Sequence, residues 1–154
     1  MSKSLQIDTI DKRVLQLLIR DSRKPVLEIA RDIGVSGAAI HQRLAKLRKR
    51  GIITGTHITL SYKELGYSTC AYLGVYLERA SEYEKVIFQL KRIPEVIECH
   101  YTTGKYSLFL KIIAQDNDHL MRLLTTNIQS ISGVSRTETF ISLDESIMRT
   151  FLPK

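Results

Sequence analysis

The stretch from Ser36 to Lys49 carries side chains that could bind nucleic acid. Drawn as a helix, its outward side is small or neutral in the first half and cationic in the second half. Small residues let a helix approach base edges, the amide of Gln42 can pair with adenine, and lysines suit phosphates. The candidate DNA-contacting residues are Ser36, Gly37, Ala38, His41, Gln42, Arg43, Lys46 and Lys49.

An ordinary solvated helix face is the alternative, because the helix macrodipole also favours the cations Arg48, Lys49 and Arg50 in a last turn. The distribution of charge argues against it. The first 56 residues hold 12 Lys and Arg against 5 Asp and Glu, whereas the remaining residues hold 11 of each. Because the excess positive charge of +7 lies in this first third, we interpret the segment as one that binds a polyanion, with double-stranded DNA favoured over RNA or a protein partner.

Three short helices are expected to position these residues. Apolar residues recur at helical spacing before and after Pro25, with Asp8 and Ser36 as candidate N-caps and Gly34 and Gly51 as stop signals. Helices two and three are separated only by the turn Gly34-Val35, which is typical of a helix-turn-helix. After Gly51, the alternation in IITGTHITL predicts a strand, which would form a wing or an arm.

Beyond the linker that we place at residues 61–67, segments of strand and helix character alternate in the order βαββαβ. This order predicts a ferredoxin-like domain in which both helices cover one face of a four-stranded sheet. The domain limits are therefore 1–60 for the helix-turn-helix with its following strand and 68–154 for the second domain. The fold class is α+β. The exposed second face of such a sheet predicts association with another copy.

Several functions are excluded by what the sequence lacks. The histidines are scattered and no nucleophile and base recur at a useful spacing, so we expect no enzyme activity, no catalytic residues and no metal site. The two cysteines, Cys70 and Cys99, lie in apolar segments and are expected to be reduced core residues. No apolar run approaches the length of a membrane span, and no secretory signal is evident, so we expect a cytoplasmic protein without membrane contact.

The order of elements and four stretches of sequence resemble the Lrp/AsnC (feast/famine) family of transcription regulators. These stretches are IDTIDKRVLQLLIRDSRKPVLEIA, RLAKLRKRGIITG, LGY at residues 65–67 and YTTGKYSLFLK. Within the family, YTTGKYS and IMRT make the chain most similar to the asparagine-responsive AsnC branch. The resemblance implies a homodimer that assembles to octamers or higher rings, with an amino-acid effector bound between dimers and no other cofactor.

The resemblance also implies which residues bind the effector. Carried over position by position, they are Tyr101, Thr103, Gly104, Tyr106, Ser107 and Gln129. Ser107 stands where many members of the family have an acidic residue, and it favours a small polar ligand, asparagine above others. The residues themselves are compatible with this role, because Gly104 frees backbone amides for a carboxylate and Gln129 can read a side-chain amide. Packing of a hairpin is the alternative role for the same residues.

Taken together, the sequence predicts a sequence-specific DNA-binding regulator whose assembly and DNA affinity respond to a small amino acid. An effector-independent architectural DNA-binding protein is the main alternative, since it would use the same basic helix without a ligand. A small-molecule enzyme built on the second domain is a third hypothesis, which the lack of a catalytic set disfavours.

Overall fold

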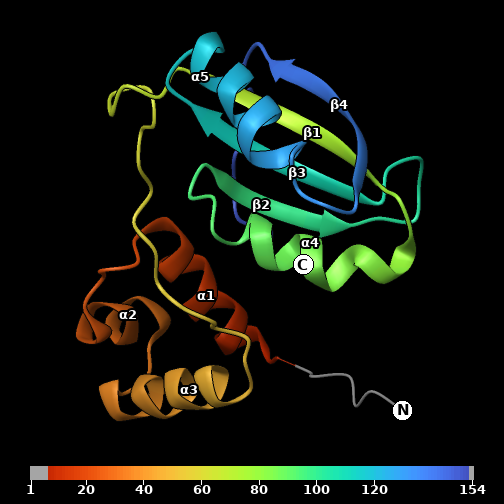
Figure 1. The fold of residues 1–154 in the computed structure, drawn as a ribbon. Helices are drawn as coiled ribbons and strands as arrows, with labels where there is room; N and C mark the ends of the chain where they lie inside the picture. Colours follow the sequence, from red (N-terminus) through yellow and green to blue (C-terminus); the bar gives the residue numbers. More distant parts are fainter. Residues whose placement is uncertain (1–6, 153–154) are drawn as a thin grey trace. The chain divides into compact units, whose positions relative to one another are not determined.

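The computed structural model describes residues 7–152, which form two compact units (Figure 1). One unit runs up to Thr59 and includes the C-terminal segment from Ile147. The other is Leu60–Ser146. None of the helices in the described part of the chain has the length and apolar character to cross a membrane.

The first unit contains three helices, whose bounds are α1 (Thr9–Arg20), α2 (Val26–Ile33) and α3 (Gly37–Lys49). Each begins close to where the sequence predicts. The side chain of Asp8 caps α1 by accepting a hydrogen bond from the Asp11 amide at 2.7 Å, and Ser36 caps α3 by accepting from the Ala39 amide at 3.2 Å. Helix α2 ends at Gly34, whose φ of 81° belongs to the left-handed region that glycine tolerates.

A small apolar core holds the three helices together. Its buried residues are Val14, Ile29, Ala30, Ile40 and Leu44. Ile40 and Leu44 belong to one stripe of α3, which fixes the opposite side of that helix as its solvent-facing side. The predicted helix-turn-helix is therefore confirmed.

The predicted strand after Gly51 is wrong. Instead of starting a strand, the amides of Ile52 and Ile53 donate to the carbonyl of Leu47 at 3.0 and 3.3 Å, and Ile53 packs against the helical core. Residues 54–60 are exposed and belong to no strand, and within residues 7–152 no segment pairs with them. Alternating residues form a strand only when another strand accepts their backbone hydrogen bonds, so among residues 7–152 the helix-turn-helix carries no wing.

The second unit has the predicted βαββαβ order. Its elements are β1 (Thr69–Leu77), a 3₁₀ turn η1 (Ala80–Glu82), α4 (Tyr83–Leu90), β2 (Val96–Tyr101), β3 (Leu108–Ala114), α5 (Asn117–Arg122), a π-helical turn η2 (Leu123–Ile128) and β4 (Val134–Ser142). The four strands form one sheet in the order β2-β3-β1-β4, and each neighbouring pair is antiparallel. Residues 61–67, which the sequence analysis assigns to a linker, form a hydrogen-bonded turn before β1.

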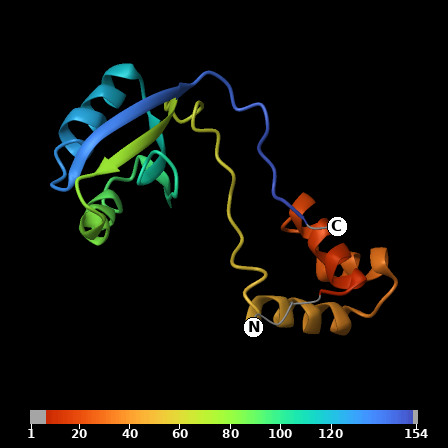
Figure 2. The same ribbon diagram turned by 90° about the vertical axis from the view of Figure 1, so that its right-hand side faces the viewer.

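Both helices cover one face of this sheet, as predicted (Figure 1 and Figure 2). The buried residues of this core come from both layers: Ala71, Leu73, Val75, Leu108, Leu110, Ile112 and Ala114 from the strands, and Val86, Leu90, Leu120, Leu123 and Ile128 from the helical layer. The strands β1 and β3 are the central ones, so their alternate residues carry most of the burial.

The other face of the sheet, here called the open face, is aromatic rather than simply apolar. Register places Tyr72 of β1 between Lys111 of β3 and Phe140 of β4, and the rings of Tyr72 and Phe109 stack with centroids 5.8 Å apart. Phe140 is 48% exposed. Because consecutive strand residues point to opposite faces, this side is not covered by the helices.

The expectation that both cysteines are core residues is wrong for Cys99. Both thiols are free, but Cys70 is half-buried and Cys99, on the edge strand β2, is exposed. An apolar segment at the edge of a sheet has no neighbour on one side, so its hydrophobic character does not ensure burial.

Candidate nucleic-acid interface and ligand-binding region

Helix α3 presents most of the predicted DNA-contacting residues together on one exposed side. Ile40, Leu44 and Leu47 are buried on the opposite side. The exposed residues are Ser36, Ala38, His41, Gln42, Ala45, Lys46 and Lys49, whereas Gly37 is half-buried beside Leu27. In the part of the chain that the structure describes, no hydrogen bond or ion pair engages the side chains of Gln42, Lys46 and Lys49. These side chains are therefore available to bind another molecule.

Arg43 differs from the other predicted DNA contacts. Its guanidinium Nη1 donates to Asp8 Oδ2 at 2.5 Å and to Asp11 Oδ1 at 2.7 Å, both at the start of α1. The Arg43 hydrogen bond, followed by that from the Asp11 amide, lowers the pKa of Asp8 below its ordinary value. The structure thus joins Arg43 to α1 rather than leaving it free on the exposed side of α3.

The predicted effector residues of the β2–β3 connection lie close together at one end of the sheet. Thr103 and Gly104 are exposed at its tip. The amide of Ser107 donates to the Val75 carbonyl at 2.9 Å, and its hydroxyl accepts from the Leu77 amide at 3.3 Å. Among the described residues this hydroxyl acts only as an acceptor, so it keeps its own proton for a further hydrogen bond.

Tyr106 is held by contacts that the sequence analysis did not predict. Its ring lies over Gly74, where a Cβ atom would come within 2.5 Å of the Tyr106 ring atoms Cγ and Cε1. Its hydroxyl donates to Glu138 Oε2 at 2.9 Å. The same carboxylate accepts from Tyr76 and Lys105, each at 2.9 Å. These residues join β1, the β2–β3 connection and β4.

Hydrogen bonding accounts for the electrostatics at Glu138. The bond from Lys105 is the largest cause, followed by those from Tyr76 and Tyr106, and together they lower the pKa of Glu138 to about 2. Glu138 is therefore a carboxylate at any physiological pH. We call Gly74, Lys105, Tyr106 and Glu138, together with Tyr76, the Glu138 cluster.

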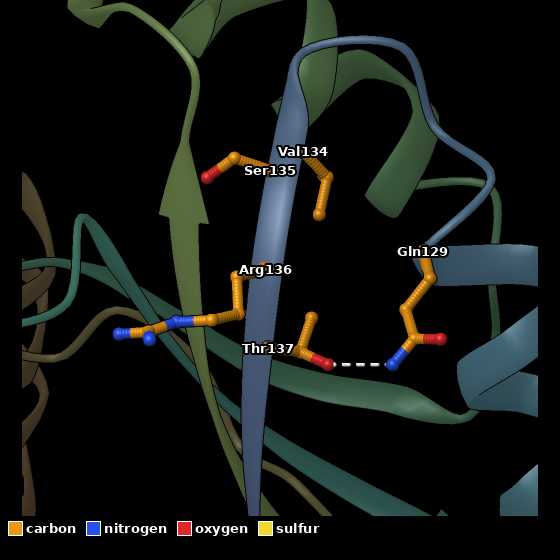
Figure 3. A pocket seen from close by; sticks show the side chains of 5 residues that line it. All are labelled: Gln129, Val134, Ser135, Arg136 and Thr137. Carbon is orange, nitrogen blue, oxygen red and sulfur yellow. Dashed lines mark hydrogen bonds between the residues drawn. The ribbon is translucent and has the colours of Figure 1, made fainter.

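Gln129 lies elsewhere. It follows η2 and donates from Nε2 to Thr137 Oγ1 at 2.8 Å, in a pocket of about 300 Å³ that Val134, Ser135 and Arg136 also line (Figure 3). Thr137 pairs with Val75 and so points to the helix-covered face, whereas the neighbouring Glu138 points to the open face. Within one chain, Gln129 and Tyr106 are therefore on opposite faces of the sheet.

Tyr101 is also on the helix-covered side. It pairs in register with the core residue Leu108, and its ring packs on that of Tyr83 with centroids 4.7 Å apart. Of the six predicted effector residues, the structure brings Thr103, Gly104, Tyr106 and Ser107 together on one connection.

Comparisons with known proteins agree with this arrangement of two units. The family model described as the AsnC-type helix-turn-helix domain matches residues 7–48, and the one described as the Lrp/AsnC ligand binding domain matches residues 70–152. The chain belongs to the Lrp/AsnC family. The family resemblance and the α+β fold predicted from the sequence are thereby confirmed.

Relatives within the Lrp/AsnC family cover almost the whole chain. The regulatory protein AsnC of Haemophilus influenzae is 42% identical over 96% of this chain and 98% of its own length. That of Escherichia coli is 40% identical over 96% and 97%. The solved structure of E. coli AsnC superposes with a TM-score of 0.92 at 39% identity, and it covers 96% of this chain and 99% of that chain.

A more distant solved structure is a feast or famine regulatory protein of M. tuberculosis complexed with L-methionine. It is 26% identical, with a TM-score of 0.88 over 96% of this chain and all of that chain. Because relatives that match over almost their whole length are regulatory proteins, and because this chain carries an AsnC-type helix-turn-helix domain, this member of the Lrp/AsnC family is a DNA-binding transcription regulator and not an enzyme.

Two groups of residues in this Lrp/AsnC chain escaped the sequence analysis. Asp8 is predicted as a helix cap, but the sequence does not identify Asp8 and Asp11 as partners of Arg43. Gly74 and Glu138 were not singled out at all. A glycine inside a predicted strand is a signal of close approach by another group, and Gly74 in YLGVYL carries that signal.

Proposed function

We propose that the exposed side of α3 enters the major groove of DNA and reads bases near its N-terminus. The observation that supports this most strongly is the division along that side. Ser36, Gly37 and Ala38 are small, His41 and Gln42 carry neutral hydrogen-bonding groups, and Lys46 and Lys49 carry free charge. The first group allows close approach, the second can contact base edges, and the third can contact phosphates.

We propose further that the protein acts as a dimer, and as larger assemblies of dimers such as an octamer. The aromatic open face supports the dimer, because rings such as Phe140 gain from being covered by a second copy. Two copies of α3 would then read half-sites about one helical turn, ~34 Å, apart. As a regulator of transcription, the protein would work in the cytoplasm.

The effector in our proposal is an amino acid, with asparagine favoured. The methionine complex of the M. tuberculosis relative supports the amino-acid class. The free proton of the Ser107 hydroxyl and the amide of Gln129 favour a side chain with an amide. Because Gln129 and Tyr106 are on opposite faces of the sheet, a ligand that touches both groups of residues needs a second copy of the chain.

The test of base reading is selection of duplexes from a random DNA pool by the full chain and by Gln42→Ala. We expect the wild type to enrich two related half-sites, and the variant to lose preference at one position in each, since a bidentate contact contributes about 1–3 kcal/mol of discrimination. Lys46→Gln is the matched control, because loss of a phosphate contact weakens all sequences alike. Equal preferences in the wild type and Gln42→Ala, or no enriched sequence at all, would contradict the proposal and favour an architectural protein.

A further inference from the structure

Arg43 lies on α3, and the following inference rests on the proposed binding of DNA by this helix. The guanidinium of Arg43 is paired with two carboxylates of the same unit. Its Nη1 atom is 2.5 Å from Asp8 Oδ2 and 2.7 Å from Asp11 Oδ1. The side chain of Arg43 is 25% exposed, that of Asp8 is 51% exposed, and that of Asp11 is 2% exposed. One guanidinium and two carboxylates together carry a net charge of −1, so the group as a whole does not attract a phosphate.

The two carboxylates that contact Arg43 both lie at the start of another helix, α1. Asp8 and Asp11 form the capping box at the first turn of α1, where each side chain bonds the other residue's amide. Arg43 is in the middle of α3, 35 and 32 residues away along the chain. One guanidinium therefore ties the start of α1 to the side of α3.

The burial of Asp11 makes its ion pair with Arg43 specific. Asp11 is the one charged residue that is buried among the described residues, and a buried carboxylate needs a counter-charge to offset its lost hydration. Arg43 is the cation that reaches it. The apolar stripe of α3 fixes which side faces the core, and the hydrogen-bonded ion pair adds a directional constraint on the orientation of the helix.

We infer that Arg43 is a positioning residue for DNA binding, which sets the orientation of α3 against the capping box of α1 and makes no contact with phosphate. Gln42 and Lys46 precede and follow it on the same helix. A small rotation of α3 moves both of these side chains relative to the groove. Loss of the contact between Arg43 and the two carboxylates therefore weakens DNA binding by changing the orientation of α3, and not by removing a charge that binds phosphate.

The test measures the dissociation constant of the full chain for a selected duplex over a range of salt concentrations. Arg43→Ala is expected to weaken binding roughly 2- to 30-fold, as residues without ligand contact do when they disturb coupling. The slope of log K against log salt stays at the wild-type value, because no phosphate contact is lost. Arg43→Lys, which keeps the charge, recovers part of the affinity.

Asp8→Asn gives an independent test, because the two possible roles of Arg43, positioning α3 and binding phosphate, predict opposite changes in DNA affinity. It removes a negative charge, and asparagine remains a good N-cap, so α1 keeps its start. A positioning role predicts weaker DNA binding, whereas a phosphate-binding Arg43 freed from its partner would bind DNA more tightly. Glu28→Gln is the matched control, since it removes one exposed negative charge from α2 without touching Arg43.

Helix content and thermal unfolding show whether each variant is folded at the assay temperature. If Arg43→Ala is not folded, the result for Asp8→Asn decides whether Arg43 is a positioning residue. The inference is overturned if Arg43→Ala reduces the salt slope by about 0.9, which is the value of one phosphate contact. It is also overturned if Asp8→Asn tightens binding, or if a folded Arg43→Ala binds like the wild type. DNA binding itself is established by the wild type in the same titration, so failure of the inference is distinct from failure of the proposed function.

Discussion

The double variant Lys46→Gln/Lys49→Gln is expected to bind a selected duplex about 60-fold more weakly than the wild type at 0.1 M salt. Each phosphate contact contributes about 0.9 to the slope of log K against log salt, so two contacts contribute about 1.8. Both lysines are exposed on α3 and glutamine is a good helix former, so the helix itself is preserved. The measurement is fluorescence anisotropy of a labelled duplex over a series of salt concentrations.

A second double variant separates this effect from that of net charge. Lys91→Gln/Arg122→Gln also removes two exposed cations, but from the ligand-binding unit. We expect its salt slope to equal that of the wild type. If both double variants change the slope equally, the basic character of the chain, rather than the C-terminal half of α3, is what binds DNA.

Gly74→Ala is expected to lower the free energy of unfolding by about 1–3 kcal/mol, the usual cost of overpacking. Its Cβ would overlap the ring of Tyr106, and the central strand β1 is paired on both sides and cannot withdraw. The ring must therefore leave, which breaks its hydrogen bond to Glu138 and displaces the connection that carries Thr103 and Ser107. Urea unfolding measures the loss of stability, and calorimetry measures the accompanying loss of effector affinity.

Two further variants define the cause of the Gly74→Ala effect. Gly104→Ala adds the same methyl group where no atom lies within 4 Å, so its stability should remain near that of the wild type. Combining Gly74→Ala with Tyr106→Ala removes the overlapping ring, so the double variant should lose less than the sum of the two single losses. Strict additivity would show that Tyr106 is not what the new methyl group meets.

Local patterns predicted most of the fold. Helical spacing of apolar residues, the N-caps Asp8 and Ser36 and the stop at Gly34 are signals within a few residues, and all are found where the sequence places them. The βαββαβ order was predictable for the same reason. The structure of residues 54–60 was not predictable from local patterns. Alternation of residue types describes a single segment, whereas a strand also depends on a partner strand elsewhere in the chain.

Only the features of the candidate sites that depend on residues close together in the sequence were predictable. A helical projection shows that Gln42 and Lys46 are exposed, but it does not show that Arg43 meets Asp8 and Asp11 in another helix. Likewise, the sequence motif identifies Tyr106 and Ser107, while their support from Gly74 and Glu138 depends on strand register. Long-range pairing was therefore what the sequence analysis lacked.

Control of its DNA affinity by an amino acid is what we propose for this regulator. Its most direct test is the dissociation constant for a selected duplex, measured with and without each of the twenty amino acids at fixed salt and protein concentration. We predict that asparagine changes this constant about 5- to 150-fold, the usual range of coupling between two sites, and that most other amino acids leave it unchanged. A constant that no amino acid changes, in a protein that still selects its DNA sequence, would contradict the claim.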